Sequence, residues 1–369
     1  MTKYLLPFIV FLSFIGCTAQ QPIEKPKIKE YKTAKPIETP QIIEEPIIEE
    51  TIEAIVEEEV INDTFKVALI FPSKFMSKYG VGASKVVSAY LVQQNINIDM
   101  QIFDCYDQDY NNLAAVFNEI KEQNISNVIG LFTSNMVNHL ATIQELETLN
   151  IYIPTINKKS TNIAMDNVVF GGIDYEQQID KLLTLGKGSV VNFHSKRGIS
   201  KKLTTILNNK NERVSNKPIA TDTNYGSVLN NSLKYKTMFL NTTMVKSSIL
   251  LSQIRGKDLR PYRILSTQLN YNPLIISLTQ SKDRSKLIFA NSIGDIDPLL
   301  EHNITLLGAD IQYDWVNYST LIGVDYLLKK TVRVVDLLSY TIDQGQVQYD
   351  VHIVKNEGYR FKSYLPVVN

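Results

Sequence analysis

The stretch Phe65-Lys66-Val67-Ala68-Leu69-Ile70-Phe71, which ends at Pro72-Ser73, decides the fold of this chain. Its apolar, β-branched and aromatic run, with a single Lys, predicts a strand that is buried on both faces. Downstream, apolar residues recur at helical spacing, at Ala83, Val86, Val87, Tyr90 and Leu91. A buried strand followed by an amphipathic helix is the unit from which parallel sheets are built.

The same alternation continues along the chain. Further strands are predicted at residues 98–103, 127–132 and 152–156, and helices at 113–120 and 134–149. After Gly171-Gly172 the alternation starts again, with helices at 177–185, 200–207 and 243–254 and strands at 189–193, 237–240 and 262–266. We therefore predict an α/β fold in which parallel sheets are covered by helices on both faces.

Two series of strands and helices predict two lobes. The region from residue 64 to residue 369 also has the size at which one hydrophobic core stops growing and chains divide. A strand at 286–290 and a helix at 315–328 follow the second series, and we expect this part to return to the first lobe. The first lobe is therefore expected at about 64–172 plus 285–369, and the second at about 173–284.

The N-terminus has the pattern of a secretory signal, with a basic residue before an apolar run at residues 4–15. This run is too short to span a bilayer, which takes roughly 20 apolar residues. The sequence Phe14-Ile15-Gly16-Cys17 resembles the lipobox of bacterial lipoproteins, which implies removal of residues 1–16 and acylation of Cys17. In such lipoproteins Asp after the cysteine favours the inner membrane. Because Thr18 follows here, we expect the periplasmic face of the outer membrane, with the inner membrane as the alternative.

Residues 17–63 differ in composition from the rest of the chain. Prolines recur at positions 22, 26, 36, 40 and 46, no glycine occurs, and a basic first half gives way to an acidic second half. Such a segment cannot bury a core, so we predict a disordered tether with a reach on the order of 100 Å. A specific binding arm is the alternative. The whole chain is neutral, with 38 basic and 38 acidic residues, and we expect no nucleic-acid partner.

Few residues suit covalent or metal chemistry. If Cys17 is acylated, Cys105 is the one remaining thiol, so no disulfide forms within the chain and Cys105 is expected to be a small buried hydrophobe. The histidines are far apart in the sequence and lack metal-ligand spacing: His139, His194, His302 and His352. The sequence has no GxxxxGK[ST], GxSxG or SxxK motif. We therefore expect no metal, no cofactor and no enzymatic activity, with a hydrolase of unfamiliar motif as the alternative.

Two glycines, Gly80 and Gly82, follow the first predicted strand. Gly80-Val81-Gly82 is similar to the start of a dinucleotide-binding fingerprint, but Lys85 stands where that fingerprint has its third glycine. We expect these glycines to ease a tight turn at the start of a helix.

Six stretches resemble a known family. VALIFP at 67–72, NVIGLFTS at 127–134 and IPTIN at 153–157 resemble type I periplasmic binding proteins. FGGIDYE at 170–176, YSTLIGVDYL at 318–327 and VQYDVHIVKNEG at 347–358 resemble the C-terminal domain of the outer-membrane lipoproteins that activate class A penicillin-binding proteins. The resemblance implies a two-lobed fold of parallel sheets. Those activators carry a large helical N-terminal domain, in whose place this chain has its tether.

A ligand cleft is expected at the carboxyl ends of the strands, where open α/β sheets bind their ligands. The candidates in the first lobe are Ser73, Thr133, Ser134 and Asn157, and those in the second are His194, Ser195, Asn241 and Thr242. Ser134 is also placed to cap its helix. Hydroxyl and amide groups beside helix N-termini suit a carboxylate or a phosphate. Positive charge at the rim is expected from Lys74, Lys78, Lys196 and Arg197.

The resemblance and the tether predict a non-enzymatic, membrane-anchored periplasmic protein. We expect it to act as a protein-interaction or regulatory domain in peptidoglycan synthesis or envelope assembly, and the resemblance implies a penicillin-binding protein as partner. A solute-binding lipoprotein of a transporter or sensor system is the alternative, in which the cleft takes a small molecule. We prefer the first reading because solute capture needs no long tether, and because the sequence shows no acidic anchor beside stacking aromatic residues.

Overall fold

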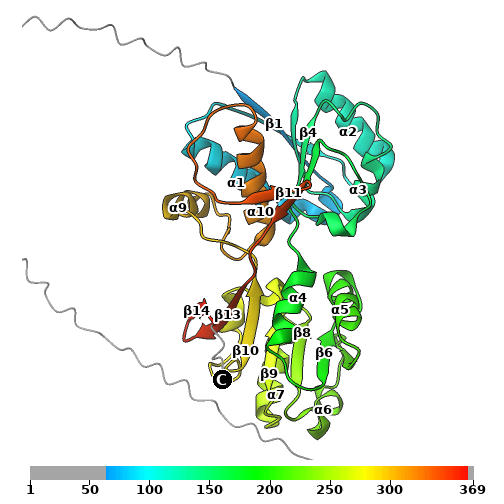
Figure 1. Ribbon diagram of the computed structural model, residues 1–369, viewed down its shortest axis with the longest axis vertical. Coiled ribbons are helices and arrows are strands. Elements are labelled where there is room, and N and C mark those ends of the chain that lie inside the picture. The colour runs from blue at the N-terminus through cyan, green and yellow to red at the C-terminus, as the bar shows by residue number, and fades with distance from the viewer. Residues whose placement is uncertain (1–63, 365–369) are drawn as a thin grey trace, which may run out of the picture. The chain divides into compact units, whose positions relative to one another are not determined.

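The computed structural model describes residues 64–364, which belong to one compact unit, Ile61–Asn369 (Figure 1). The predicted signal peptide at 1–16, the acylated Cys17 and the tether at 17–63 lie outside the described residues.

The first lobe is built on a seven-stranded sheet in the order β11-β12-β5-β4-β3-β1-β2. Its strands are β1 (Phe65–Phe71), β2 (Ile98–Asp104), β3 (Asn127–Gly130), β4 (Asn150–Ile153), β5 (Val168–Phe170), β11 (Thr341–Asp343) and β12 (Gln346–Gln348). The pairs are parallel except for the β11–β12 hairpin. β1 lies between β2 and β3, and its residues Val67 to Ile70 have no exposed surface, which confirms the doubly buried strand predicted there.

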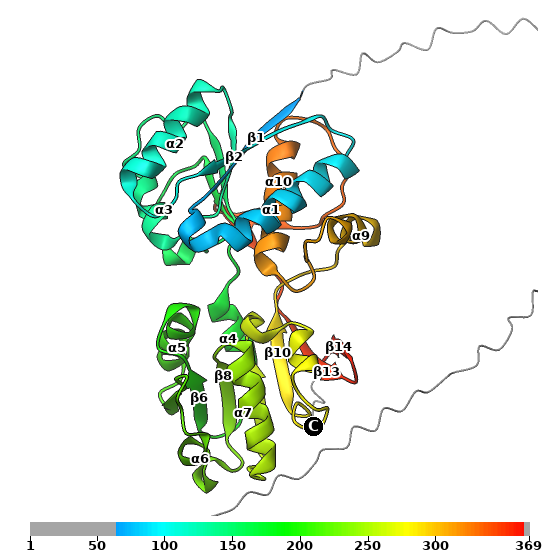
Figure 2. The ribbon, with the colours of Figure 1, turned by 180° about the vertical axis from the view of Figure 1, so that it is seen from behind.

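Helices cover both faces of this sheet. They are α1 (Ser73–Gln93), α2 (Tyr110–Glu122), α3 (Ser134–Leu140), the short η1 (Lys158–Ser160), α9 (Pro298–Leu306) and α10 (Trp315–Lys329). Because side chains alternate along a strand, Val67 and Leu69 of β1 join the core with α1, α9 and α10, while Ala68 and Ile70 join the core with α2 and α3. Seen from behind, α1 and α10 lie side by side (Figure 2).

The second lobe repeats this plan with the strand order β14-β13-β10-β9-β8-β6-β7. Its strands are β6 (Val190–His194), β7 (Val214–Pro218), β8 (Thr237–Asn241), β9 (Arg263–Ser266), β10 (Leu287–Asn291), β13 (His352–Glu357) and β14 (Arg360–Ser363). Its helices are α4 (Tyr175–Thr184), α5 (Gly198–Lys210), α6 (Tyr225–Val228), η2 (Asn231–Leu233), α7 (Met244–Gly256), η3 (Gln268–Asn270) and α8 (Leu274–Ser277). The predicted α/β fold with two lobes of mainly parallel sheet is confirmed.

The expected return of residues 285–369 to the first lobe is wrong for three strands. β10 pairs in parallel with β9, and β13 pairs antiparallel with β10 and with β14, so all three extend the second sheet. All five residues of β10 are buried, which requires sheet partners on both sides. The chain therefore passes between the lobes three times, after β5, after β10 and after β12.

Two local expectations are also wrong. Gly80 and Gly82 lie in the middle of α1, which begins at Ser73, and form no turn. A Cβ atom would lie 2.5 Å from the ring of Phe71 at Gly80 and 2.5 Å from Oδ1 of Asn317 at Gly82, so the glycines let α1 pack closely on β1 and α10. The helix expected at 134–149 ends at Leu140, and Glu145 has a positive φ of 58° that no helix continues through.

Candidate ligand cleft between the lobes

A cleft of about 340 Å³ lies where the two lobes face each other. Its lining comes from α1, α10 and the residues before α10 in the first lobe, and from α4, α5, α7 and η3 in the second. The lining residues are Lys78, Tyr79, Tyr175, Ile199, Met244, Gln268, Leu269, Tyr271, Asn272, Tyr313, Asp314 and Trp315.

Aromatic side chains from both lobes meet in this cleft. The ring centroids of Tyr175 and Trp315 are 6.4 Å apart at an interplanar angle of 88°, and those of Tyr271 and Tyr313 are 5.3 Å apart. Burial, and to a lesser degree Tyr313 and Asp310, raises the pKa of Tyr271 to about 12. The tyrosines are therefore neutral at physiological pH and offer ring faces together with hydroxyl groups.

Asp314 adds an acidic group among these rings. Its Oδ1 accepts hydrogen bonds from the backbone N–H groups of Val316 at 3.0 Å and Asn317 at 3.3 Å, so it caps α10. Burial raises the pKa of Asp314, and this effect outweighs the two amide donors and the nearby Lys78, which lower it. Both capping bonds go to the same oxygen, Oδ1.

Gln268 contributes a hydrogen-bond donor that has no partner. Its Oε1 accepts from the backbone N–H of Ser292 at 2.7 Å, and its own backbone N–H donates to Oε1 of Gln178 at 2.9 Å. Gln178 in turn donates through Nε2 to Oγ of Ser292 at 2.7 Å. Gln268 is 4% exposed, and its Nε2 has no hydrogen-bond partner among the described residues. A buried unpaired donor is costly, so the amide of Gln268 is an unsatisfied polar group in a residue that lines the cleft.

The predicted candidates of the first lobe lie elsewhere. Ser73 starts α1 and donates through its backbone N–H to Oδ1 of Asp104 at 3.0 Å. Thr133, not Ser134, occupies the capping position of α3, without a side-chain capping bond, and Ser134 is exposed. The Oγ1 atom of Thr133 is buried and has no partner in the described part of the chain. Asn157 is buried and bonded within the protein, as described below.

The structure brings the four candidates of the second lobe together at the ends of β6 and β8, where His194 and Ser195 are half-buried and Asn241 and Thr242 are buried. His194 at the end of β6 is the register partner of Asn241 in β8, and Oγ of Ser195 lies 3.1 Å from Oγ1 of Thr242. The Nδ2 of Asn241 donates to Oδ1 of Asn192 at 3.0 Å. Within residues 64–364, none of the eight predicted candidates lines the cleft, whereas Lys78 of the expected basic rim does.

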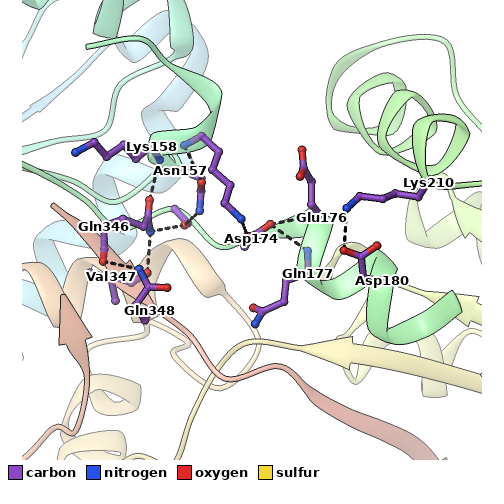
Figure 3. A network of polar contacts seen from close by, with 12 residues as sticks. Asn157, Lys158, Asp174, Glu176, Gln177, Asp180, Lys210, Gln346, Val347 and Gln348 are labelled. Carbon is purple, nitrogen blue, oxygen red and sulfur yellow. Dashed lines mark hydrogen bonds and ion pairs between the residues drawn. The ribbon is translucent and has the colours of Figure 1, made fainter. Parts of the chain in front are cut away.

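Polar contacts hold the first crossing of the chain in place (Figure 3). Nδ2 of Asn157 donates to the carbonyl of Gly172 at 2.9 Å, and Nε2 of Gln346 donates to the same carbonyl at 3.1 Å. A Cβ atom at Gly172 would lie 2.3 Å from the backbone of Ile156, so glycine is required there. Lys159 forms an ion pair with Asp174 at 2.6 Å, and Asp174 caps α4.

Sequence reasoning missed the lining of the cleft because its members are far apart in the chain. Tyr175 follows directly on the crossing after Gly171-Gly172, and Asp314-Trp315 opens α10, so both flank places where an element begins. Aromatic residues at such positions were an available signal. The free Nε2 of Gln268 was not, since it depends on bonds to segments distant in sequence.

Two further kinds of feature are absent from residues 64–364, metal-ligand clusters and membrane-spanning helices. No group of three or more His, Cys, Asp or Glu side chains in this range could hold a metal ion. No helix in it combines the length and hydropathy that crossing a bilayer requires.

Comparisons with known proteins agree with this architecture. No protein-family model matches the chain, and no curated protein matches it in sequence. Among solved structures, LivJ of Streptococcus pneumoniae, a substrate-binding protein of a branched-chain amino acid transporter in complex with isoleucine, is 13% identical with a TM-score of 0.58. The match covers 82% of this chain and 98% of LivJ. A solute-binding protein of Rhodopseudomonas palustris in complex with p-hydroxybenzoic acid is 13% identical with a TM-score of 0.58, over 82% and 96% of the two chains.

A regulatory protein matches as well. The C-domain of LpoA from Haemophilus influenzae, a regulator of PBP1A, is 12% identical with a TM-score of 0.54, over 81% of this chain and 100% of that domain. The chain spans 59% of the length of full-length LpoA. Identities this low show the fold alone. The domain therefore has the type I periplasmic-binding-protein-like fold, which confirms the predicted resemblance, and its neighbours include both solute-binding and regulatory proteins.

Proposed function

We propose that this chain is a lipid-anchored periplasmic binding module that holds a small aromatic molecule between its lobes. The observation that carries the proposal is the cleft lining, in which rings from both lobes surround Asp314, Lys78 and the free amide donor of Gln268. In the sequence, no acidic residue stands out as a ligand anchor beside stacking aromatic residues. In the folded protein such residues lie together in the cleft. For this reason we favour non-enzymatic ligand binding over a protein-interaction domain.

The test uses Trp315 as a reporter, because it is the one tryptophan of the chain and lines the cleft. We expect p-hydroxybenzoate, an aromatic probe with acceptor oxygens, to change the Trp315 fluorescence saturably and to raise the melting temperature. A probe at 100 times its dissociation constant adds about 2.7 kcal/mol of stability. Isoleucine, which has no ring, is the comparison probe and is expected to give weaker changes in both signals.

Three variants locate the binding. Gln268→Glu keeps an oxygen for the Ser292 amide but replaces the free donor by an acceptor, and Lys78→Ala removes a charge at the cleft. Gln268→Glu should weaken binding by about tenfold or more, because a buried donor is replaced by an acceptor. Lys78→Ala should weaken binding less, because the Lys78 side chain is exposed. Lys74→Ala is the matched control, since Lys74 also lies on α1 but does not line the cleft. The affinity of this variant for p-hydroxybenzoate should equal that of wild type. Unchanged fluorescence and melting temperature with p-hydroxybenzoate and a panel of other aromatic carboxylates would contradict the proposal.

A second candidate is regulation of an envelope enzyme through direct contact, with a penicillin-binding protein as partner. The observation in its favour is an apolar surface on the first lobe, where Val92 of α1 and Leu306 at the end of α9 are each 70% exposed. Large exposed apolar surfaces mark protein contacts. If the protein acts in this way, the double variant Leu306→Asp, Val92→Asp should no longer co-purify with the penicillin-binding protein from membranes. Its binding of p-hydroxybenzoate should remain as in wild type.

A further inference from the structure

The strands of the second sheet begin at one edge, and that edge carries basic residues. In the register of the sheet, Val190 of β6 pairs with Val214 of β7 and with Thr237 of β8, which pairs with Arg263 of β9. The residues directly before the strands β7, β8 and β10 are Arg213, Lys236 and Lys286. Parallel register therefore aligns positive charge along this edge, at the opposite ends of the strands from the cleft.

Neighbouring segments add to the charge. Arg255 lies at the end of α7, and one hollow of about 120 Å³ brings it together with Arg260, Lys282 and Lys286. The same hollow holds Asp283 and Asp258, and Asp258 forms an ion pair with Arg260 at 2.7 Å, so the other three basic residues exceed the remaining carboxylate. Residues 232–287 carry ten Lys or Arg and two Asp or Glu, in a chain whose total charge is zero. We define the basic pole as Arg213, Lys234, Lys236, Arg255, Lys282 and Lys286.

Tyrosines are interleaved with these charges and point to solvent. Tyr235 lies between Lys234 and Lys236 and is 68% exposed, and Tyr359 in the β13–β14 turn is 89% exposed. Tyr235 has a positive φ of 60° and Arg260 one of 47°, and the amide of Tyr235 donates to the carbonyl of Arg260 at 3.3 Å. Positive φ is unfavourable for bulky residues, so these two positions are held against their intrinsic preference, as functional positions often are.

We propose that the basic pole binds the anionic headgroup surface of a phospholipid bilayer. Lys and Arg are attracted to anionic lipids, and tyrosine rings favour the headgroup level of a membrane. The choice of a bilayer over another polyanion rests on the export signal and membrane anchor of the proposed function. The cleft plays no part in it, so the vesicle test below and the ligand test above fail independently.

The experiment uses residues 18–369, the chain that follows the expected signal and the cysteine, so that neither the apolar run at 4–15 nor an acyl chain contributes to binding. Flotation with vesicles of equal phosphatidylglycerol and phosphatidylcholine is compared with phosphatidylcholine vesicles. We expect binding to the anionic vesicles alone, and its loss as salt rises, since salt screens exposed charges. The triple variant Lys234→Gln, Arg255→Gln and Lys282→Gln should lower the partition coefficient by on the order of 100-fold, at about fivefold per charge removed.

The matched control removes three exposed charges outside the basic pole, with Lys66→Gln, Lys196→Gln and Lys201→Gln. It should bind the anionic vesicles like the parent chain. Tyr359→Ser should weaken binding without changing the melting temperature. Equal losses in the two triple variants, equal binding to both kinds of vesicle, or no binding to anionic vesicles would each overturn the proposal, the last of these in favour of an acidic protein partner.

Discussion

At the scale of single residues, Asp325 is the most constrained charge of the first lobe. It lies in α10 with no exposed surface, and its two oxygens accept from the hydroxyls of Tyr90 and Tyr340, each at 2.5 Å. Lys329 forms an ion pair with it at 3.0 Å. Burial, reinforced by the bond to Asp325, raises the pKa of both tyrosines, which therefore stay protonated and donate. Through its bonds with Tyr90 of α1 and Tyr340, Asp325 connects α1 with the segment that follows α10.

Asp325→Ala is expected to lower the free energy of unfolding by about 3 kcal/mol, because it leaves two buried hydroxyls without their acceptor and removes one of the two carboxylates paired with Lys329. Urea unfolding followed by circular dichroism measures the loss. The control is Asp336→Ala, which removes the other carboxylate paired with Lys329, at 2.7 Å but on an exposed side chain. This control should change stability little. Equal losses in the two variants would contradict the role of Asp325.

At the scale of elements, α4 begins where the chain first enters the second lobe, and Asp174 starts it. Its Oδ1 accepts from the backbone N–H groups of Glu176 and Gln177, and Oδ2 pairs with Lys159 of the first lobe. Burial alone would raise the pKa of Asp174, but Lys159 and the two amide donors outweigh it, so the pKa is lowered from its ordinary value of 3.8. A lowered pKa means that the folded state favours the charged form.

Asp174→Asn keeps the capping oxygen but removes the charge, and Asp174→Ala removes both. We expect Asp174→Ala to cost about 1 kcal/mol more than Asp174→Asn, the value of a helix cap. The unfolding free energy of wild type should exceed that of Asp174→Asn by its full amount above the ordinary pKa of 3.8. This difference should be lost as the pH falls from 3.8 through the lowered pKa of the folded state. Unfolding free energies measured across acidic pH test this expectation.

The long buried elements could be predicted from the sequence, and the polar edges could not. β1 and α10 follow from unbroken or helically spaced apolar residues, because burial itself imposes that pattern. β7 reads Val214-Ser215-Asn216-Lys217-Pro218, an edge strand that is mostly exposed and so lacks an apolar signature. The mistaken boundary at residue 285 has another cause. Spacing shows that 286–290 is a strand, but only pairing decides which sheet it joins.

The site was less predictable than the fold. Residues after strands, such as Ser195 and Thr242, follow from the rule that ligands bind at the carboxyl ends of strands, and the structure brings them together. Their hydroxyls bond to each other, and neither residue lines the cleft. Which polar atom is left without a partner is a property of the folded whole, as Gln268 illustrates.

At the scale of the whole molecule, the proposed anchor is Cys17. We expect Cys17→Ala to release the protein from membranes, because no apolar run after residue 20 approaches the roughly 20 residues that span a bilayer. Fractionation of cells followed by immunoblotting measures the distribution. Ser13→Ala, a change within the signal that keeps the cysteine, should leave membrane association intact. Recovery of the Cys17→Ala protein in membranes at the wild-type level would contradict lipid anchoring.

The three crossings between the lobes also govern how the protein is made. The first sheet needs β12 and the second needs β13 and β14, so both wait for strands at residues 346–363 that are synthesised after every helix of the domain. Contacts of such long sequence separation form slowly. A nascent chain with this topology therefore stays incompletely folded while its earlier segments emerge from the ribosome, and an incompletely folded chain is the form that a narrow secretion pore can thread.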